Sequence, residues 1–268
     1  MKFSNYKILR VLTILLGISL TLVSIAGAFL PGTYVRDATS MEAQGIGQDL
    51  VDLFLVAPLL LVSYYFLVRG KKTAILVYGG TLFYIMYSFI IYCFGVHFNQ
   101  LFLIYCLTLG LSLYAFILFM MDLRKQDVGS WFKDAPVKLI SAYIFFVALV
   151  FYALWLKSVV PAIIRGTIPP EVSDYDLLVN PVHVIDMAFA LPGLIIGAVL
   201  LWRKQSMGYL IASIALIFMI LLTVALAGMV FMLLVRQISE DFSVAIVFGV
   251  LTLTSIAAAI LLFGKIGE

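Results

Sequence analysis

The sequence predicts an all-α membrane protein with eight transmembrane helices. Of the 268 residues, 64% are hydrophobic and only 12% are charged, and the mean hydropathy is +1.16. A soluble domain has about 25% charged residues, so this chain has too few polar side chains to cover a surface in water. Lipid requires each backbone amide to be hydrogen-bonded within its own segment, and the apolar runs lack the alternation of a membrane β-strand. The runs are therefore expected to be helices.

Eight apolar runs are long enough to cross the bilayer, because a helical span needs about 20 mostly apolar residues for about 30 Å of hydrocarbon. The predicted spans are Ile8–Leu30, Leu50–Val68, Thr73–Gly95, Leu101–Met121, Leu139–Val160, Val182–Trp202, Met207–Val235 and Phe242–Phe263. The segments 31–49 and 161–181 contain Gly, Pro and acidic residues and are expected to be exposed loops. The first run also has features of a cleavable signal peptide, since it ends in Ala26-Gly27-Ala28, although its length favours a retained span.

The positive charges predict that both termini lie in the cytoplasm. If odd-numbered spans start inside, the inner segments hold 13 of the 17 Lys and Arg residues, and 10 of the 14 acidic residues fall outside. Cytoplasmic loops are enriched in Lys and Arg, so this orientation is favoured.

An offset of 134 residues relates the two parts of the chain. It places Asp52, Pro58 and Arg69 on Asp186, Pro192 and Arg203, respectively. The pattern predicts two parallel four-span halves, residues 1–121 and 139–268, joined by a cytoplasmic linker at 122–138. Chance similarity is the alternative. Each proline removes one backbone hydrogen bond, which predicts helix kinks at Pro58 and Pro192.

Ionisable and amide side chains gather at the outer ends of the spans. The candidate binding residues are Asp49, Asp52, His97, Asn99, His183 and Asp186. The 17 residues from Asp52 to Arg69 correspond to about 25 Å of helix, which places the carboxylate near the outer edge of the hydrocarbon. Charged groups at this depth are costly and often functional. We expect the side chains of Asp52, both histidines and Asp186 to line one outer-facing pocket, with Asp49 at its rim.

Simpler roles are open for the same residues. An Asp near a helix N-terminus caps the helix and suits its dipole. If a metal binds, His97, His183 and Asp186 are its expected ligands, but their spacing matches no metal motif. Tyrosines crowd the first half, and we interpret most of them as packing residues; a tyrosine-lined cavity is the alternative. No motif indicates a cofactor, and no basic patch indicates nucleic acid.

Several motifs resemble an uncharacterised family of bacterial eight-span integral membrane proteins. They are Gly47-Gln48-Asp49-Leu50-Val51-Asp52 with Pro58, the run from Tyr92 to Tyr105, and Val184-Ile185-Asp186 with Pro192. The resemblance covers most of the chain. It implies a bacterial inner membrane and the same eight-span layout, and it carries no activity.

These observations favour a multi-pass inner-membrane protein that transports or binds a small solute or ion. The position of the carboxylates near the outer edge counts against transport, because transporter sites usually lie near the midplane. One alternative is an outer-leaflet membrane enzyme with a His/Asp site, which could depend on a metal. Another is a non-catalytic sensor or assembly partner. Apart from a solute or ion, the expected partner is the lipid bilayer.

Overall fold

The computed structural model describes residues 6–239 and 242–267, and within these ranges the chain is built from helices. Eight of these described helical segments are long and apolar enough to cross a membrane, which confirms the eight-span prediction. They are Tyr6–Phe29, Thr39–Val68, Lys72–Gly95, Phe102–Leu123, Val137–Arg165, Pro181–Trp202, Ser206–Val235 and Ser243–Phe263. The protein is therefore a multi-pass helical membrane protein.

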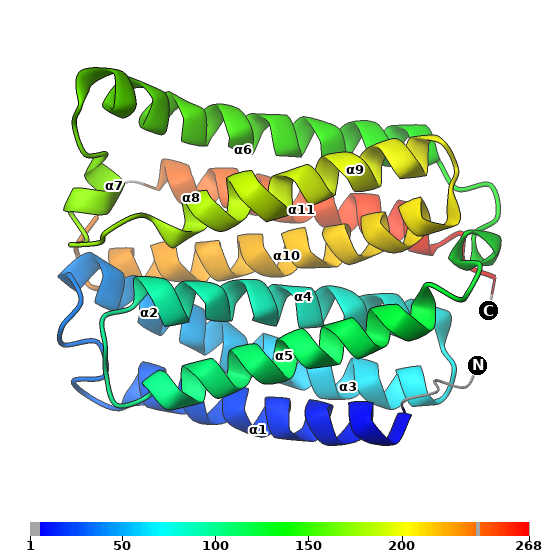
Figure 1. Ribbon diagram of the computed structural model, residues 1–268, viewed down its shortest axis with the longest axis horizontal. Coiled ribbons are helices and arrows are strands. Elements are labelled where there is room, and N and C mark those ends of the chain that lie inside the picture. Colours follow the sequence, from blue (N-terminus) through cyan, green and yellow to red (C-terminus); the bar gives the residue numbers. More distant parts are fainter. Residues whose placement is uncertain (1–5, 240–241, 268) are drawn as a thin grey trace.

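The first four spans pack side by side in the lower part of Figure 1. They consist of α1 (Tyr6–Phe29), a continuous helix formed by α2 (Thr39–Val51), η1 (Asp52–Val56) and α3 (Ala57–Val68), then α4 (Lys72–Gly95) and α5 (Phe102–Leu123). We call this group the first half.

The last four spans form the upper part of Figure 1, after a short 3₁₀ turn, η2 (Val128–Trp131). They consist of α6 (Val137–Arg165), the short α7 (Pro170–Ser173), a continuous helix of α8 (Pro181–Ile185), η3 (Asp186–Ala190) and α9 (Leu191–Trp202), then α10 (Ser206–Val235) and α11 (Ser243–Phe263). We call this group the second half.

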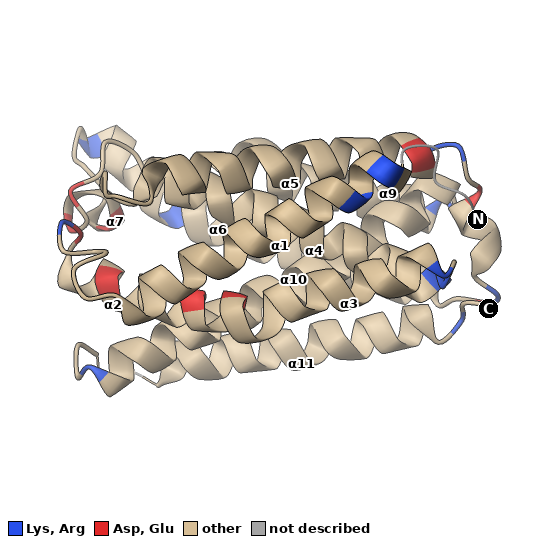
Figure 2. Cartoon of the chain, turned by 90° about the horizontal axis from the view of Figure 1, so that it is seen from below, with Lys and Arg blue, Asp and Glu red and all other residues tan. Residues whose placement is uncertain are grey.

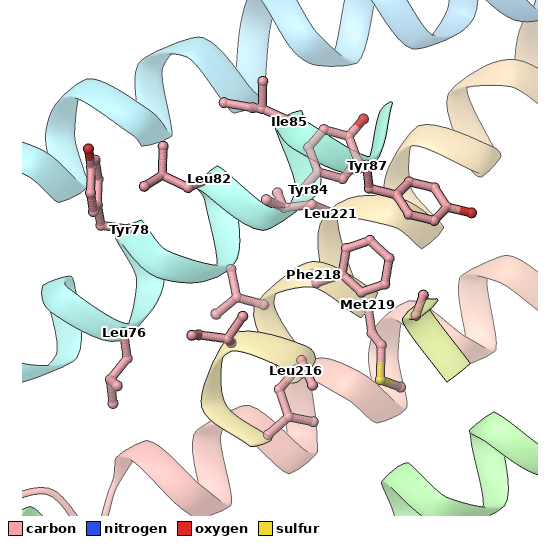
Figure 3. Close-up of a cluster of buried hydrophobic side chains, with 14 of the residues drawn as sticks. Leu76, Tyr78, Leu82, Tyr84, Ile85, Tyr87, Leu216, Phe218, Met219 and Leu221 are labelled. Carbon is pink, nitrogen blue, oxygen red and sulfur yellow. The ribbon is translucent and has the colours of Figure 1, made fainter. Parts of the chain in front are cut away.

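Helices α4 and α10 form the centre of the molecule and join the halves. They are the most buried of the described spans and pack directly on each other. Figure 3 shows large apolar and aromatic side chains of both helices, and the ring centroids of Tyr87 from α4 and Phe218 from α10 lie 5.1 Å apart. The second contact between the halves is made by α2, which packs along α10. The helices that carry the carboxylates therefore lie next to this central pair.

We call the end of the molecule opposite the described chain ends the distal end. Two predicted span boundaries at the distal end are wrong. The second span begins at Thr39, not at Leu50, because the polar segment before Asp49 packs as a helix against α1 and α10. The fifth span continues through Pro161 to Arg165. Large parts of the two expected loops are therefore helical, and Asp52 is the fourteenth residue of a 30-residue helix.

Both prolines at the predicted kinks follow a π-helical turn. These turns are η1 and η3, which have five residues each and begin at Asp52 and Asp186. A proline ring clashes with the carbonyl four residues earlier in an α-helix, and a wider turn relieves that clash. In each turn the carbonyl of the Asp accepts the N–H of the residue five positions later. π-Turns of this kind are frequent at functional sites.

Charged residues gather at the two ends of the bundle, as Figure 2 shows, whereas acidic positions in the α2 segment lie along its length. The described residues nearest to both chain termini lie at the same end. There the linker and the C-terminal segment are joined by hydrogen bonds from Lys133 N to Lys265 O (2.8 Å) and from Gly267 N to Trp131 O (2.9 Å). Lys72 Nζ donates a further bond to Gly267 O. The linker and α4 are therefore both tied to the C-terminal segment at this end.

Candidate functional site

A cavity of about 270 Å³ lies between the two halves near the distal end. We call it the central cavity. Residues of α2 and α4 line it from the first half, and residues of α6, α8, η3 and α10 line it from the second half. The aromatic lining residues that carry a hydroxyl or an indole N–H group are Tyr34, Tyr84, Tyr87, Tyr92, Tyr175 and Trp155. A tyrosine-lined cavity, the less favoured of the two interpretations of the tyrosines, is thus present.

Asp186 is the predicted site residue that lines the central cavity. Its Oδ1 accepts a hydrogen bond from the Tyr87 hydroxyl at 2.9 Å, and its Oδ2 accepts one from Trp155 Nε1 at 2.8 Å. Both donors are neutral, and the residue is only 5% exposed. The carboxyl group is therefore oriented by one aromatic side chain from each half.

Asp52 lies behind the tyrosines that line the central cavity. The Tyr84 hydroxyl donates to Asp52 Oδ1 at 2.8 Å, and Asp52 is 1% exposed. Tyr84 and Tyr87 are both on α4, and in Figure 3 their hydroxyl groups point in different directions. One central helix therefore holds the carboxyl groups of Asp52 in the first half and Asp186 in the second half.

Asp49 is fully buried, so the prediction that it lies at the rim of a pocket is wrong. Its carboxyl group accepts hydrogen bonds from the hydroxyl groups of Tyr34 (2.5 Å) and Tyr92 (2.9 Å). Gly27 of α1 leaves the space that this group fills, since a Cβ at Gly27 would lie 1.7 Å from Asp49 Oδ2. The side chain is deeper than residue counting indicated because the helix that carries it starts at Thr39.

No cation neutralises these three carboxyl groups within the described ranges 6–239 and 242–267. The Arg side chain paired at this end, that of Arg236, contacts Glu42 at 2.9 Å, on the outside of the bundle. A buried carboxylate without a cation is strongly disfavoured. Hydrogen bonds from tyrosine and tryptophan stabilise Asp49, Asp52 and Asp186, and a proton or a cation from solution would remove the remaining cost of burying a charge.

The two histidines do not reach the central cavity. His97 Nδ1 and its backbone N–H both contact Asp37 Oδ1 at 2.9 Å. His183 packs on Trp155, with 4.7 Å between the ring centroids, and its Nε2 lies 3.6 Å from Glu171 Oε1. The prediction that both histidines share one pocket with Asp52 and Asp186 is therefore wrong.

Asn99 also lies outside the central cavity, and the expected metal ligands do not come together. Asn99 Oδ1 accepts the backbone N–H of Leu101 at 2.9 Å, and its amide donates to the Tyr105 hydroxyl, so it shapes the turn before α5. In the part of the chain that the structure describes, no three His, Cys, Asp or Glu side chains come together as a metal site would need. The set of His97, His183 and Asp186 is therefore not assembled.

Two groups at the distal end, outside the spans, have shifted pKa values. Burial raises the pKa of Tyr34 well above its ordinary value, and the neighbouring Asp49 raises it further. Tyr34 therefore remains a hydrogen-bond donor. Burial alone would raise the pKa of Glu171, but hydrogen bonds from Ser158 and from its own backbone N–H, together with His183, lower it below the usual value. Glu171 is thus an anion beside His183.

Trp155, Gln44 and Gln48 line the central cavity and were not predicted from the sequence. Trp155 lies in an apolar run of the sequence, and nothing in that run indicates that its indole N–H donates to a buried carboxyl group. The two glutamines belong to the segment 31–49, for which the sequence predicts a loop. Their spacing of four residues, which places them on one face of a helix, is the signal that could have identified them.

The arrangement defines a class of protein: a multi-pass helical membrane protein with an aromatic and carboxylate-lined cavity between two groups of four spans. Comparisons with protein-family models, with curated proteins and with solved structures found no match to this chain.

Proposed function

We propose that the protein binds a small solute in the central cavity and transports it across the membrane. The observation that carries the proposal is the position of Asp186, whose carboxyl group faces the cavity while Tyr87 of one half and Trp155 of the other hold it. A site held by both groups of spans changes shape when one group moves relative to the other, and transporter sites lie at such boundaries. A cavity of about 270 Å³ is close to the lower limit of ligand pockets, about 300 Å³, which favours a small solute.

Transport also fits an internal duplication, which we propose as the origin of the two halves. The bounds of η1 and α3, shifted by 134 residues, equal those of η3 and α9. The next helices, α4 and α10, begin at positions 72 and 206, which differ by the same 134 residues. If the halves arose by duplication, residues 6–121 superpose on the second half after a rotation about an axis near the membrane normal.

The outer-leaflet enzyme has less support. It needs imidazole groups beside Asp52 and Asp186, whereas His97 contacts Asp37, His183 Nε2 lies 3.6 Å from Glu171 Oε1, and neither histidine lines the central cavity. A sensor that binds without transport shares the binding site that we propose. Flux measurements separate those two functions.

We further propose that the protein belongs to the uncharacterised bacterial family that it resembles and lies in the inner membrane with both termini in the cytoplasm. The Lys and Arg distribution supports this orientation. A reporter fused after Glu268 is expected to be active in the cytoplasm, and one inserted between Leu178 and Val179 is expected to be active outside. A C-terminal reporter that is active only outside would contradict the orientation.

Filling the central cavity is expected to abolish solute binding. Ile91 lines the cavity and is only partly buried, so Ile91→Trp adds volume inside it. The purified protein is screened by thermal shift against a panel of small amines, alcohols, carboxylates and sugars. Solutes that raise the melting temperature of the original protein are expected to have no effect on Ile91→Trp.

Ile260→Trp is the matched control, because Ile260 is 66% exposed on α11 and does not line the cavity. It is expected to retain all the shifts. Solutes that bind are then tested for counterflow in proteoliposomes. Equal shifts in both variants would place binding elsewhere, and binding without counterflow would indicate a sensor.

A further inference from the structure

We infer that the solute is a small organic cation, an ammonium group on an apolar body, with the ammonium group bound at Asp186. This inference rests on the proposed function, because it names the class of solute for the same cavity. It follows from the charge of the lining, from the chemistry of the aromatic side chains and from the hydrogen bonds of Asp186, which come from neutral donors.

The charge of the lining has one sign. The residues that line the central cavity include Asp37 and Asp186, and no Lys, Arg or His of the described chain is among them. His97 contacts Oδ1 of Asp37, whereas Oδ2 of Asp37 is buried without a hydrogen-bond partner, so Asp37 is a second acceptor in the lining. We assign the ligand ammonium to Asp186 because both halves orient its carboxyl group. Asp52 and Asp49 lie one tyrosine away from the cavity and add to the negative potential if they are ionised. An anionic solute would be repelled by this lining.

Asp186 can accept further donors. Each of its oxygens receives one hydrogen bond, from Tyr87 and from Trp155, and a carboxylate oxygen has lone pairs for two. Its present donors orient the group without neutralising it. A ligand ammonium would supply the missing positive charge and a charge-assisted hydrogen bond, which is about twice as strong as a neutral one.

The remaining walls favour an organic ion over a bare metal ion. Tyr87, Tyr92 and Trp155 offer aromatic rings, which attract cations within about 6 Å of the ring. Apolar side chains such as Phe151, Leu222 and Met229 complete the lining. A divalent metal needs about six oxygen ligands, and within the described chain no three His, Cys, Asp or Glu side chains come together to hold one. An apolar body with one ammonium group matches both parts of the lining.

The test uses three probes with the same body and different charge: phenethylammonium, the neutral 2-phenylethanol and the anion phenylacetate. Binding to the purified full-length protein in nanodiscs is measured by calorimetry. Phenethylammonium is expected to bind at least about tenfold more tightly than 2-phenylethanol, a difference of about 1.4 kcal/mol. Phenylacetate is expected to bind most weakly.

Asp186→Asn is expected to remove the preference for the cation, and the exposed Asp174→Asn, which changes the net charge equally, is expected to retain it. Tyr87→Phe, which leaves the carboxyl group in place, provides a second variant if Asp186→Asn does not fold. It is expected to shift affinity for all three probes without reversing their order. Equal or tighter binding of 2-phenylethanol or phenylacetate would overturn the inference and leave the proposed function intact. Binding of none of the probes, with no response in the broader solute panel, would overturn both.

Discussion

Replacing Gly47 with leucine is expected to eliminate most of the folded protein. Gly47 in α2 contacts the backbone of α10, and an added Cβ would lie 2.3 Å from Gly228 O and 2.7 Å from Met229 Cα. The contact is reciprocal, since a Cβ at Gly228 would lie 2.9 Å from Gly47 O. Small residues allow this close approach of membrane helices. Backbone atoms cannot rotate away as a side chain can, so α2 would have to separate from α10.

We expect this change to reduce the free energy of unfolding by about 3 kcal/mol or more, at the upper end of the range for overpacked sites. The measurement is the yield of monodisperse protein on size-exclusion chromatography, together with its melting temperature in detergent. Gly110→Leu is the control, because a Cβ at Gly110 in α5 would meet no atom within 4 Å. A Gly47→Leu protein as stable as Gly110→Leu would show that α2 and α10 are not in direct contact. That result would also contradict the wall of the central cavity that α2 and α10 form.

The number and the approximate positions of the spans could be predicted because they depend on length and hydropathy alone. The start of the second span could not. Five of the ten residues from Thr39 to Gln48 are polar and two are glycine, and hydropathy identifies helices that face lipid. This segment is helical because it packs against α1 and α10. The error also moved Asp49 from the interior, where the structure places it, to the rim.

Only part of the candidate site could be predicted from the sequence, and the reason is similar. Counting residues gives the depth of a side chain in the membrane but not the direction in which it points. His97 and Asp186 were expected to meet because their depths match, yet His97 turns to Asp37 in the loop after α1. The tyrosines that hold the carboxyl groups have no spacing that distinguishes them from packing residues. By contrast, the match of Pro58 with Pro192 did locate two similar backbone features, because proline acts on its own helix.

Replacing Asp49 with leucine is expected to destabilise the protein strongly, whereas Asp49→Asn is expected to preserve its fold. Leucine fills the space but leaves the buried hydroxyl groups of Tyr34 and Tyr92 without their acceptor. Each unsatisfied buried group costs about 1–3 kcal/mol, so the expected loss is about 2–6 kcal/mol. Asparagine keeps one carbonyl oxygen that can accept from one tyrosine, and its amide can donate to the hydroxyl oxygen of the other.

The comparison of the two variants decides whether the charge of Asp49 matters. The measurements are melting temperature and binding of phenethylammonium, with the original protein as reference. Because Asp49 does not line the central cavity, Asp49→Asn is expected to bind this probe with an affinity within about threefold of the original, a difference of less than about 1 kcal/mol. If Asp49→Asn folds as well as the original and loses binding, the carboxyl group acts through its charge on the bound cation. If it unfolds as readily as Asp49→Leu, the two tyrosines require a carboxyl group as their acceptor, and Asp49 stabilises the wall between α1, α2 and α4.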